Sequence, residues 1–178
     1  MPNKPVVEHF KYCPNCSKSS ITTFQENAIR CPDCDFELYF NPNSSAAALI
    51  FDNKNRLLVI ERAREPAKGK YGVPGGFIDY HESAEDALRR EVKEETNLDI
   101  TSFQFFGSFP NLYPYKQVIY PTLDLYFTAK VDSFENAKIE ESEVLGIHLV
   151  EPARVSNDQW AFRSLRAVIA KLLADKKT

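Results

Sequence analysis

The chain has 178 residues, a formal net charge of −3, and 43% hydrophobic and 26% charged residues. Its length fits one main domain with room for a small second module, and its composition is that of a globular protein. The negative charge argues against a protein that mainly coats nucleic acid, and no apolar run reaches the roughly 18 residues of a membrane-spanning helix. The first ten residues lack the apolar core of a signal peptide, so we expect a cytoplasmic protein with no membrane partner.

All four cysteines come early in the chain, as two C-x-x-C pairs: Cys13 with Cys16, and Cys31 with Cys34. Two such pairs, separated here by 14 residues, predict a tetrahedral site in which four thiolates bind Zn²⁺. Two disulfides would be the alternative, but disulfides require an oxidising compartment. Because four sulfurs leave no open coordination position, we expect a structural zinc ribbon rather than a catalytic zinc site.

The charge of this early segment argues against a nucleic-acid partner. Residues 1–40 carry four basic and five acidic side chains, so they offer little attraction to a phosphate backbone. The turn-rich segment 39–45 follows, and the sequence changes character after it. We therefore predict a zinc-ribbon module over residues 1–40 and a second, larger domain over residues 41–178.

The larger domain opens with two short apolar runs, residues 46–51 and 57–62, which a turn-rich loop joins. They predict a pair of strands. A loop rich in glycine and proline follows over residues 64–76. Three later runs also predict strands: residues 100–109, 122–131 and 144–150.

A helix is expected over residues 83–96. Ser83 with Asp86 fits a capping box, in which the serine oxygen accepts a hydrogen bond from a first-turn N–H. Asn97 stands where the helix ends, and asparagine tolerates the left-handed dihedral angles of that position. The apolar stripe of this helix repeats every four residues: Ala84, Leu88 and Val92.

The last segment predicts an amphipathic helix packed on the body of the domain. It has a polar start, followed by apolar residues at helical spacing: Trp160, Leu165, Val168, Ile169 and Leu172. The predicted order is strands, helix, strands, helix. A mixed sheet with helices on its faces buries all of these apolar stripes, so we expect an α/β fold.

Glu91, Glu94 and Glu95 crowd one face of the first predicted helix. At about 100° per residue they fall on an arc of roughly 100°, where like charges repel. A divalent cation would turn this repulsion into attraction, and carboxylates one turn apart, such as Glu91 and Glu95, suit Mg²⁺ or Mn²⁺. A solvated acidic face is the alternative. Upstream, Gly75 or Gly76 can bring a backbone carbonyl close to the same cation.

The residues around these glutamates extend the pattern. Glu82 stands six positions after Gly76, and Arg90 directly precedes Glu91. The stretch GFIDYHESAEDALRREVKEETNL, residues 76–98, resembles the Nudix box, a loop-helix-loop signature of the same length. It matches eight of the nine fixed positions of that box. We therefore expect a member of the Nudix family.

Two positions depart from the family pattern. Asn97 replaces the glycine of the box, which is a mild change because asparagine also adopts left-handed dihedral angles. His81 stands where the family often has glycine, and we favour a turn residue over one that faces the site. The resemblance covers residues 44–170 and implies an α/β/α sandwich with a mixed sheet. A zinc ribbon ahead of a Nudix domain is the arrangement of NADH pyrophosphatases and their relatives.

The resemblance also implies a reaction: hydrolysis of the diphosphate linkage in a nucleoside diphosphate-linked substrate such as ADP-ribose, NADH or a related dinucleotide. It implies that Glu91, Glu95 and the Gly76 carbonyl bind catalytic Mg²⁺ or Mn²⁺. Glu94 would join this cluster or orient the attacking water. Arg90 would hold the glutamates in place by charge-assisted hydrogen bonds.

Further acidic residues are candidates for the same site. Glu82 would support the cluster as another ligand or as a hydrogen-bonding partner. Members of the family differ in which glutamate is the general base, and that residue can lie outside the box. Among the acidic residues Glu140, Glu141 and Glu143, we choose Glu141 as the further metal ligand or base.

The substrate is less well defined by the sequence. The Ser-Gln-Pro-Trp-Pro-Phe-Pro signature that NADH pyrophosphatases carry after the box is absent. In the family, a proline near Pro114 is associated with ADP-ribose and a tyrosine near Tyr115 with dinucleoside polyphosphates, so this rule does not decide. Aromatic side chains of this region can stack on an adenine, and we select Phe109, Tyr113 and Tyr115.

Two other functions stay open. A non-catalytic Nudix-like nucleotide sensor would signal through the ribbon, although such proteins usually lose the carboxylates that this chain keeps. An RNA-cap pyrophosphatase would cleave the same kind of linkage, and the lack of a basic stripe argues against it. Relatives often pair, so a homodimer is a further expectation.

Overall fold

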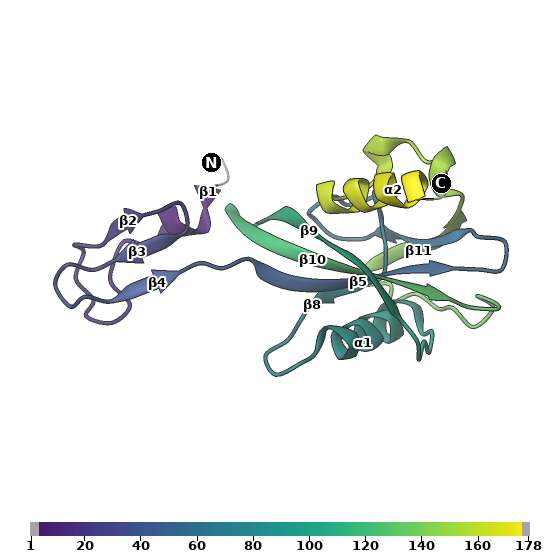
Figure 1. Ribbon diagram of the computed structural model, residues 1–178, viewed down its shortest axis with the longest axis horizontal. Coiled ribbons are helices and arrows are strands. Elements are labelled where there is room, and N and C mark those ends of the chain that lie inside the picture. The colour runs from purple at the N-terminus through teal and green to yellow at the C-terminus, as the bar shows by residue number, and fades with distance from the viewer. Residues whose placement is uncertain (1–3, 176–178) are drawn as a thin grey trace. The chain divides into compact units, whose positions relative to one another are not determined.

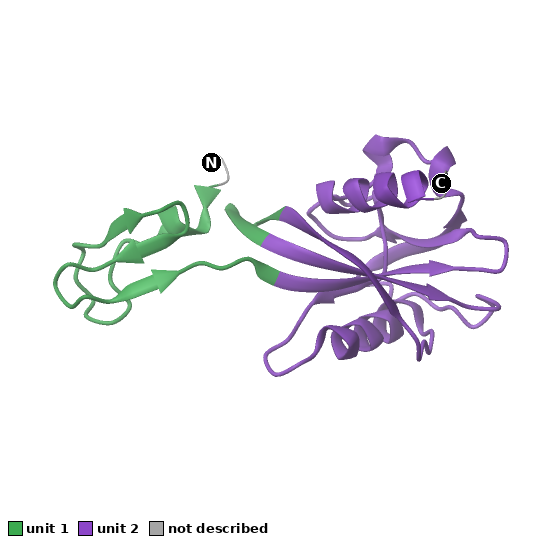
Figure 2. Cartoon of the chain, in the orientation of Figure 1, with its two compact units in different colours: residues 1–43, 112–121 green, residues 44–111, 122–178 purple. Residues whose placement is uncertain are grey.

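The structure is a computed structural model that describes residues 4–175. The chain divides into two compact units (Figure 2). Unit 1 contains residues 1–43 and 112–121, and unit 2 contains residues 44–111 and 122–178. Among the described residues, no helix is both long and apolar enough to cross a membrane.

Unit 1 contains the four cysteines and a small antiparallel sheet. Its strands are β2, Thr22–Phe24; β3, Ala28–Arg30; and β4, Glu37–Tyr39. Near the start of the chain, β1, Lys4–Pro5, pairs in parallel with Val118–Ile119, and a 3₁₀ turn covers Val6–His9. The buried apolar side chains are few, and Ile29 is the largest of the sheet. A module with so small a core fits the expectation that a metal contributes to its folding.

Unit 2 is built on a mixed sheet in which β10, β5, β6 and β11 are neighbours in that order. The short strands β7 and β8 pair with β6 and β5, and β9 pairs with β10 (Figure 1). The bounds are β5, Asn43–Phe51; β6, Leu57–Arg62; β7, Tyr71–Gly72; β8, Gly75–Phe77; β9, Gln104–Tyr115; β10, Val118–Lys130; and β11, Val144–Val150.

Two helices cover opposite faces of this sheet (Figure 1). They are α1, Ala84–Thr96, and α2, Arg163–Asp175. Successive residues of a strand point to opposite faces, so each strand contributes to two cores. The core under α1 includes Ala48, Ile50, Leu58, Leu88 and Val92. The core under α2 includes Leu49, Phe51, Val59, Leu165 and Ile169. The predicted α/β/α sandwich with a mixed sheet is confirmed.

The short strands β7 and β8 form within the predicted loop 64–76 or at its end, and the structure differs from the predicted elements in two further places. Strand β9 continues through Pro110 and Pro114 to a tight turn at Lys116 and Gln117, both of which have positive φ. Proline is tolerated at the edge of a sheet, where its missing N–H faces no partner. The other difference is Trp160, which is buried but precedes α2. It follows two 3₁₀ turns, Pro152–Arg154 and Asn157–Gln159.

Candidate active site

The caps of α1 fix the register of its glutamates. Ser83 accepts a hydrogen bond from the Asp86 N–H through its Oγ (3.1 Å). At the other end, Asn97 has φ 57° and donates its N–H to the Lys93 carbonyl (2.9 Å). Both predicted caps are confirmed, and asparagine adopts the left-handed conformation for which the Nudix box usually has glycine.

Strand β8 provides the backbone against which two of these glutamates lie. The Gly75 N–H donates to Glu95 Oε2 (2.9 Å). The Glu91 carboxylate lies so close to Gly76 that a Cβ at that position would collide with it. Gly76 is paired with Ala46 of β5, which holds the strand in place. The predicted meeting of Glu91, Glu95 and Gly76 is therefore present in the geometry.

Arg90 connects three of the acidic side chains. Its Nε and Nη2 donate to the two oxygens of Glu82 (3.0 and 2.9 Å), which is a bidentate pair. Its Nη1 donates to Glu91 Oε1 (2.7 Å) and, at a longer 3.4 Å, to Glu94 Oε2. The hydrogen bond from Arg90 holds the pKa of Glu82 below its usual value. Arg90 thus fixes Glu82 and Glu91, whereas Glu94 is 58% exposed and more loosely held.

Burial sets the electrostatics of the other glutamates. Glu95 is 7% exposed, and this burial raises its pKa to about 8, although the hydrogen bond from Gly75 acts in the opposite direction. Burial also raises the pKa of Glu91, and Arg90 partly offsets that effect. Both carboxylates would gain from a nearby cation. Two carboxylates beside a bare glycine backbone form an oxygen donor set that fits Mg²⁺ or Mn²⁺.

The acidic loop before β11 places Glu141 and Glu143 differently with respect to the α1 glutamates. Glu141 is exposed and lines a separate hollow with apolar neighbours such as Ile139 and Ile147. Glu143 lies nearer to the glutamates of α1, since its charge contributes to the raised pKa of Glu91 and of Glu95. Nothing in the sequence ranks these two residues, because the difference depends on where β11 begins.

Glu143 is held in place from the loop after β6. Its Oε1 accepts a hydrogen bond from Arg64 Nη1 (2.9 Å), and its carbonyl accepts one from the Ala63 N–H (2.9 Å). The next residue, Val144, pairs with Arg62 at the end of β6. These contacts bring the loop after β6 and the start of β11 together beside the α1 glutamates.

The three aromatic residues selected as substrate contacts are not gathered in one unit. Phe109 belongs to unit 2, where its ring packs edge-on against Tyr126 with centroids 5.8 Å apart. Tyr113 and Tyr115 belong to unit 1, with their rings 6.5 Å apart. Phe109 is therefore partly committed to the core under α2. Substrate contact by these residues stays a prediction.

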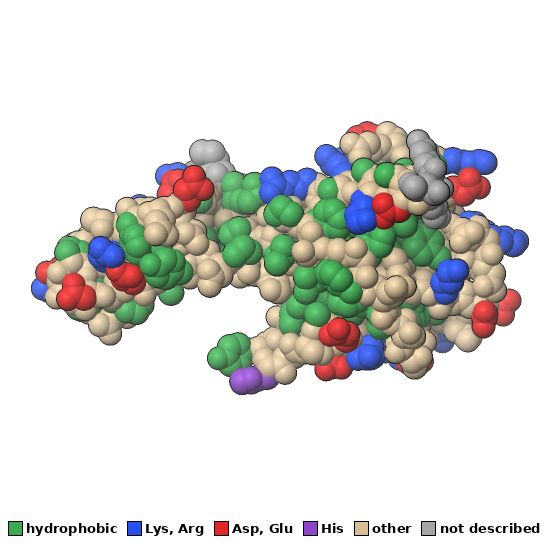
Figure 3. All heavy atoms as spheres, viewed as in Figure 1, with side chains coloured by type: hydrophobic (Ala, Val, Ile, Leu, Met, Phe, Trp, Pro, Cys, Tyr) green, Lys and Arg blue, Asp and Glu red, His purple; other side chains and the backbone are tan. Residues whose placement is uncertain are grey.

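The loop between β8 and α1 shows why a histidine replaces glycine there. His81 has φ 72°, a left-handed conformation, which is the role of a turn residue. Its ring lies 4.4 Å from that of Tyr80, which is 91% exposed. Figure 3 shows acidic and basic side chains interspersed with hydrophobic ones on the visible face of the chain.

The four cysteines of unit 1 form a compact cluster. Their Sγ atoms all lie within 4.8 Å of one another, and they are free thiols. The Asn15 amide donates to Cys34 Sγ (3.5 Å), which lowers the pKa of that thiol to about 7. Such a cluster fits a tetrahedral ion with sulfur ligands. Within residues 4–175, no other group of three or more cysteine, histidine or acidic side chains has its ligand atoms so close together. The α1 glutamates are not gathered within this distance.

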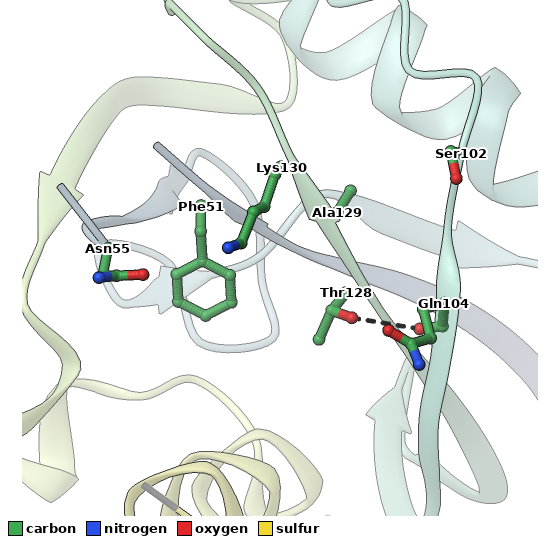
Figure 4. Close-up of a pocket in the computed structure, with 7 residues that line it drawn as sticks. All are labelled: Phe51, Asn55, Ser102, Gln104, Thr128, Ala129 and Lys130. Atoms are coloured by element: carbon green, nitrogen blue, oxygen red, sulfur yellow. Dashed lines mark hydrogen bonds between the residues drawn. The ribbon is translucent and has the colours of Figure 1, made fainter. Parts of the chain in front are cut away.

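A pocket of about 520 Å³ lies at the far end of β5 from the glutamates (Figure 4). Gly76 pairs with Ala46, whereas the pocket begins at Phe51, about 16 Å further along the strand at roughly 3.3 Å per residue. Its lining contains no carboxylate: Phe51, Asn55, Ser102, Gln104, Thr128, Ala129 and Lys130. This pocket is separate from the candidate metal site.

Known proteins resemble this chain in sequence and in fold. The NAD-capped RNA hydrolase NudC of Vibrio atlanticus (strain LGP32) is 29% identical over 109 residues, which cover 61% of this chain and 40% of that protein. The chain spans about half the length of the curated relatives it matches. A NUDIX hydrolase structure from Nitrosomonas europaea has a TM-score of 0.65 at 22% identity, covering 90% of this chain and 88% of that one.

A second solved structure is the NUDIX domain of Shewanella oneidensis NrtR complexed with ADP ribose. It has a TM-score of 0.62 at 21% identity and covers 78% of this chain and 90% of that one. At these identities the solved structures establish a shared fold. The family model described as NUDIX domain matches residues 41–172, which include the box and all of the sandwich except the last residues of α2. The chain therefore belongs to the NUDIX domain family.

Proposed function

We propose that this protein is a pyrophosphohydrolase that uses divalent metal ions to cleave the diphosphate linkage of a nucleoside diphosphate-linked substrate. The observation that carries the proposal is the position of Glu91 and Glu95 against the bare backbone of Gly75 and Gly76. A solvated acidic face, the alternative considered above, would not bury a carboxylate to 7% exposure. The retained carboxylates also favour an enzyme over a non-catalytic nucleotide sensor.

The residues that would hold Mg²⁺ or Mn²⁺ are Glu91, Glu95 and the Gly76 carbonyl, with Glu143 as a further ligand in place of Glu141. When bound, these ions supply charge neutralisation on the diphosphate and a lowered pKa for water. Arg90 keeps Glu82 and Glu91 in one orientation through its hydrogen bonds. That bracing reduces the cost of organising the site when substrate arrives.

Glu94 is the best candidate to orient the attacking water. It is exposed, its one hydrogen bond within residues 4–175 is the long one from Arg90, and it lies on the same helix as Glu91 and Glu95. A carboxylate with that freedom can accept a proton from water while its neighbours bind cations. Glu143 is the second candidate for this role.

For the substrate, we propose a dinucleotide such as NADH or NAD, with ADP-ribose as a second candidate. Support comes from relatives named NAD-capped RNA hydrolase and from a similar domain complexed with ADP ribose. The named activity of the relatives also gives weight to a cap-like substrate, in which the same linkage is attached to RNA. The acidic balance of residues 1–40 counts against extensive RNA contact.

We also propose a structural Zn²⁺ on Cys13, Cys16, Cys31 and Cys34, which fits a reducing compartment such as the cytoplasm because the four thiols are free. A homodimer remains a prediction, which sedimentation of the purified protein would test.

The decisive test is the metal-dependent release of AMP from ADP-ribose and from NADH. Glu95→Gln removes a metal ligand and Glu94→Gln removes the carboxylate that would orient the attacking water, so each should lower kcat by about 10²–10⁴-fold. Glu85→Gln is the matched control, because Glu85 is an exposed glutamate in the first turn of the same helix. Wild-type turnover in both site variants would refute the proposal. NAD-capped RNA and dinucleoside polyphosphates complete the substrate panel.

A further inference from the structure

Arg64, in the loop after β6, has no role in the function proposed so far. Its side chain is 59% exposed, and its Nη1 donates to Glu143 Oε1 (2.9 Å). This is its one ion pair with the residues that the structure describes. An exposed pair of this kind contributes little to stability, because solvent screens it. Its position beside the α1 glutamates gives it another use.

The other guanidinium groups near the site are already committed. Arg90 donates two hydrogen bonds to Glu82, one to Glu91 and one to the Phe77 carbonyl. It also makes the long contact with Glu94. Arg62 donates to the Pro66 carbonyl (2.9 Å) and its guanidinium carbon lies 4.9 Å from the centre of the Phe162 ring. Neither can turn toward a substrate without losing several contacts. Arg64 would lose one.

The partner of Arg64 in that contact is Glu143, which is also a proposed metal ligand. Glu143 lies close enough to Glu91 and Glu95 for its charge to act on both, and its backbone is fixed by Ala63. If Glu143 serves as a ligand, its negative charge is shared with a cation and no longer attracts Arg64 as strongly. A diphosphate, which carries two negative groups, then becomes the better partner for a planar guanidinium.

We propose that Glu143 holds Arg64 in the metal-free protein, and that Arg64 moves to the diphosphate of the substrate once Glu143 becomes a metal ligand. The inference rests on the proposed function and adds a substrate-binding residue to it. Metal binding and substrate binding then strengthen each other. The metal takes Glu143 away from Arg64, and the diphosphate takes Arg64 away from Glu143. Arg64 would be a binding residue and would not take part in proton transfer.

The test compares Arg64→Ala with wild type by two binding measurements. Mn²⁺ affinity is measured by electron paramagnetic resonance without nucleotide, and affinity for α,β-methylene ADP-ribose is measured calorimetrically at saturating Mn²⁺. Without Arg64, Mn²⁺ should bind about 2–5-fold tighter, because an exposed ion pair no longer competes for Glu143. The analogue should bind about tenfold more weakly or worse, because a charge-assisted contact is lost.

Arg154→Ala is the matched control. Arg154 is also exposed and forms an ion pair with a glutamate, Glu151 (2.7 Å), on a 3₁₀ turn distant in sequence from the box. Both affinities should stay at wild-type values in this variant. Arg64→Lys should keep part of the analogue affinity, since it retains the charge but not the planar fork.

The inference requires both results for Arg64→Ala, tighter binding of Mn²⁺ and weaker binding of the analogue. If Mn²⁺ binds no tighter, or if the analogue binds as in wild type, the inference is wrong. In that case the proposed function still stands as long as Glu95→Gln abolishes turnover in the wild-type background. A wild-type protein with neither Mn²⁺ binding nor metal-dependent turnover would overturn both.

Discussion

Two candidate metal sites lie in this chain, and the structure prepares them in opposite ways. The four cysteine sulfurs of unit 1 all lie within 4.8 Å of one another, a complete ligand set for one ion. The glutamates of α1 are not gathered so closely among the described residues. Arg90 and the β8 backbone hold them instead, and burial penalises the charged form of Glu95.

The difference follows from what supports each site. Unit 1 has short strands and few buried side chains, so we expect the free energy of metal binding to contribute to its folding. Unit 2 has two hydrophobic cores, one on each face of its sheet, and can fold around a site that is electrostatically unfavourable without its ions. A structural site is thus completed by the chain, whereas a catalytic site leaves room for metal and substrate.

The largest effect that separates the two sites is expected from Cys31→Ser. Cys31 is fully buried in the thiol cluster, and a structural zinc site contributes about 10 kcal/mol or more to the folding of such modules. We expect loss of bound zinc by mass spectrometry and loss of amide protection throughout β2, β3 and β4 in hydrogen exchange. Strands β5 and β6 should stay protected. Ser19→Ala, an exposed change in the loop before β2 of the same unit, is the control. Joint unfolding of both units would contradict the comparison.

A smaller but sharper effect is expected from the two glycines of β8. In Gly76→Ala the new Cβ collides with the end of the flexible Glu91 side chain, so the fold should survive while kcat falls by about 10–100-fold. In Gly75→Ala it collides with the backbone carbonyl of Ala46 at φ 148°, so stability should fall by about 2–4 kcal/mol. Thermal unfolding with steady-state kinetics distinguishes them. Equal losses of stability would be evidence against the placement of Glu91.

The effect that is smallest per pH unit concerns the pH dependence of unit 2. The folded pKa of Glu95 is raised to about 8 from an ordinary value of 4.5, so its contribution to stability is full below pH 4.5 and is lost as pH rises through 8. Between those limits, the free energy of unfolding of the metal-free protein should fall by about 1.4 kcal/mol per pH unit relative to that of Glu95→Gln. Melting curves in chelator at pH 6, 7 and 8 measure this difference. Saturating Mn²⁺ should remove it, and parallel curves without metal would contradict the burial of this carboxylate.

Much of the fold and the centre of the site could be predicted from local sequence. The capping signals at Ser83 and Asn97 act within one helical turn, and both caps form as expected. The spacing of Glu91 and Glu95 places them on one helix face, which is a property of the helix alone. The cysteine pairs are likewise local. Each of these predictions depends on geometry that a few neighbouring residues determine.

The remainder depends on contacts between segments distant in the chain. Neighbouring residues in the sequence could not decide between Glu141 and Glu143, because the position of Glu143 depends on the pairing of β11 with β6. Of the three aromatic residues selected as substrate contacts, the hairpin of β9 and β10 assigns Phe109 to the core of unit 2 and Tyr113 and Tyr115 to unit 1. The prolines of β9 also led to the prediction that this edge strand ends at residue 109, although it continues to Tyr115.

The most direct measurement is an anomalous diffraction map from crystals of the full chain soaked with Mn²⁺ and α,β-methylene ADP-ribose. Our account predicts a manganese peak bounded by the carboxylates of Glu91 and Glu95 and the carbonyl of Gly76, with the diphosphate of the analogue completing its coordination. A map with the analogue bound and no manganese beside those three groups would contradict it.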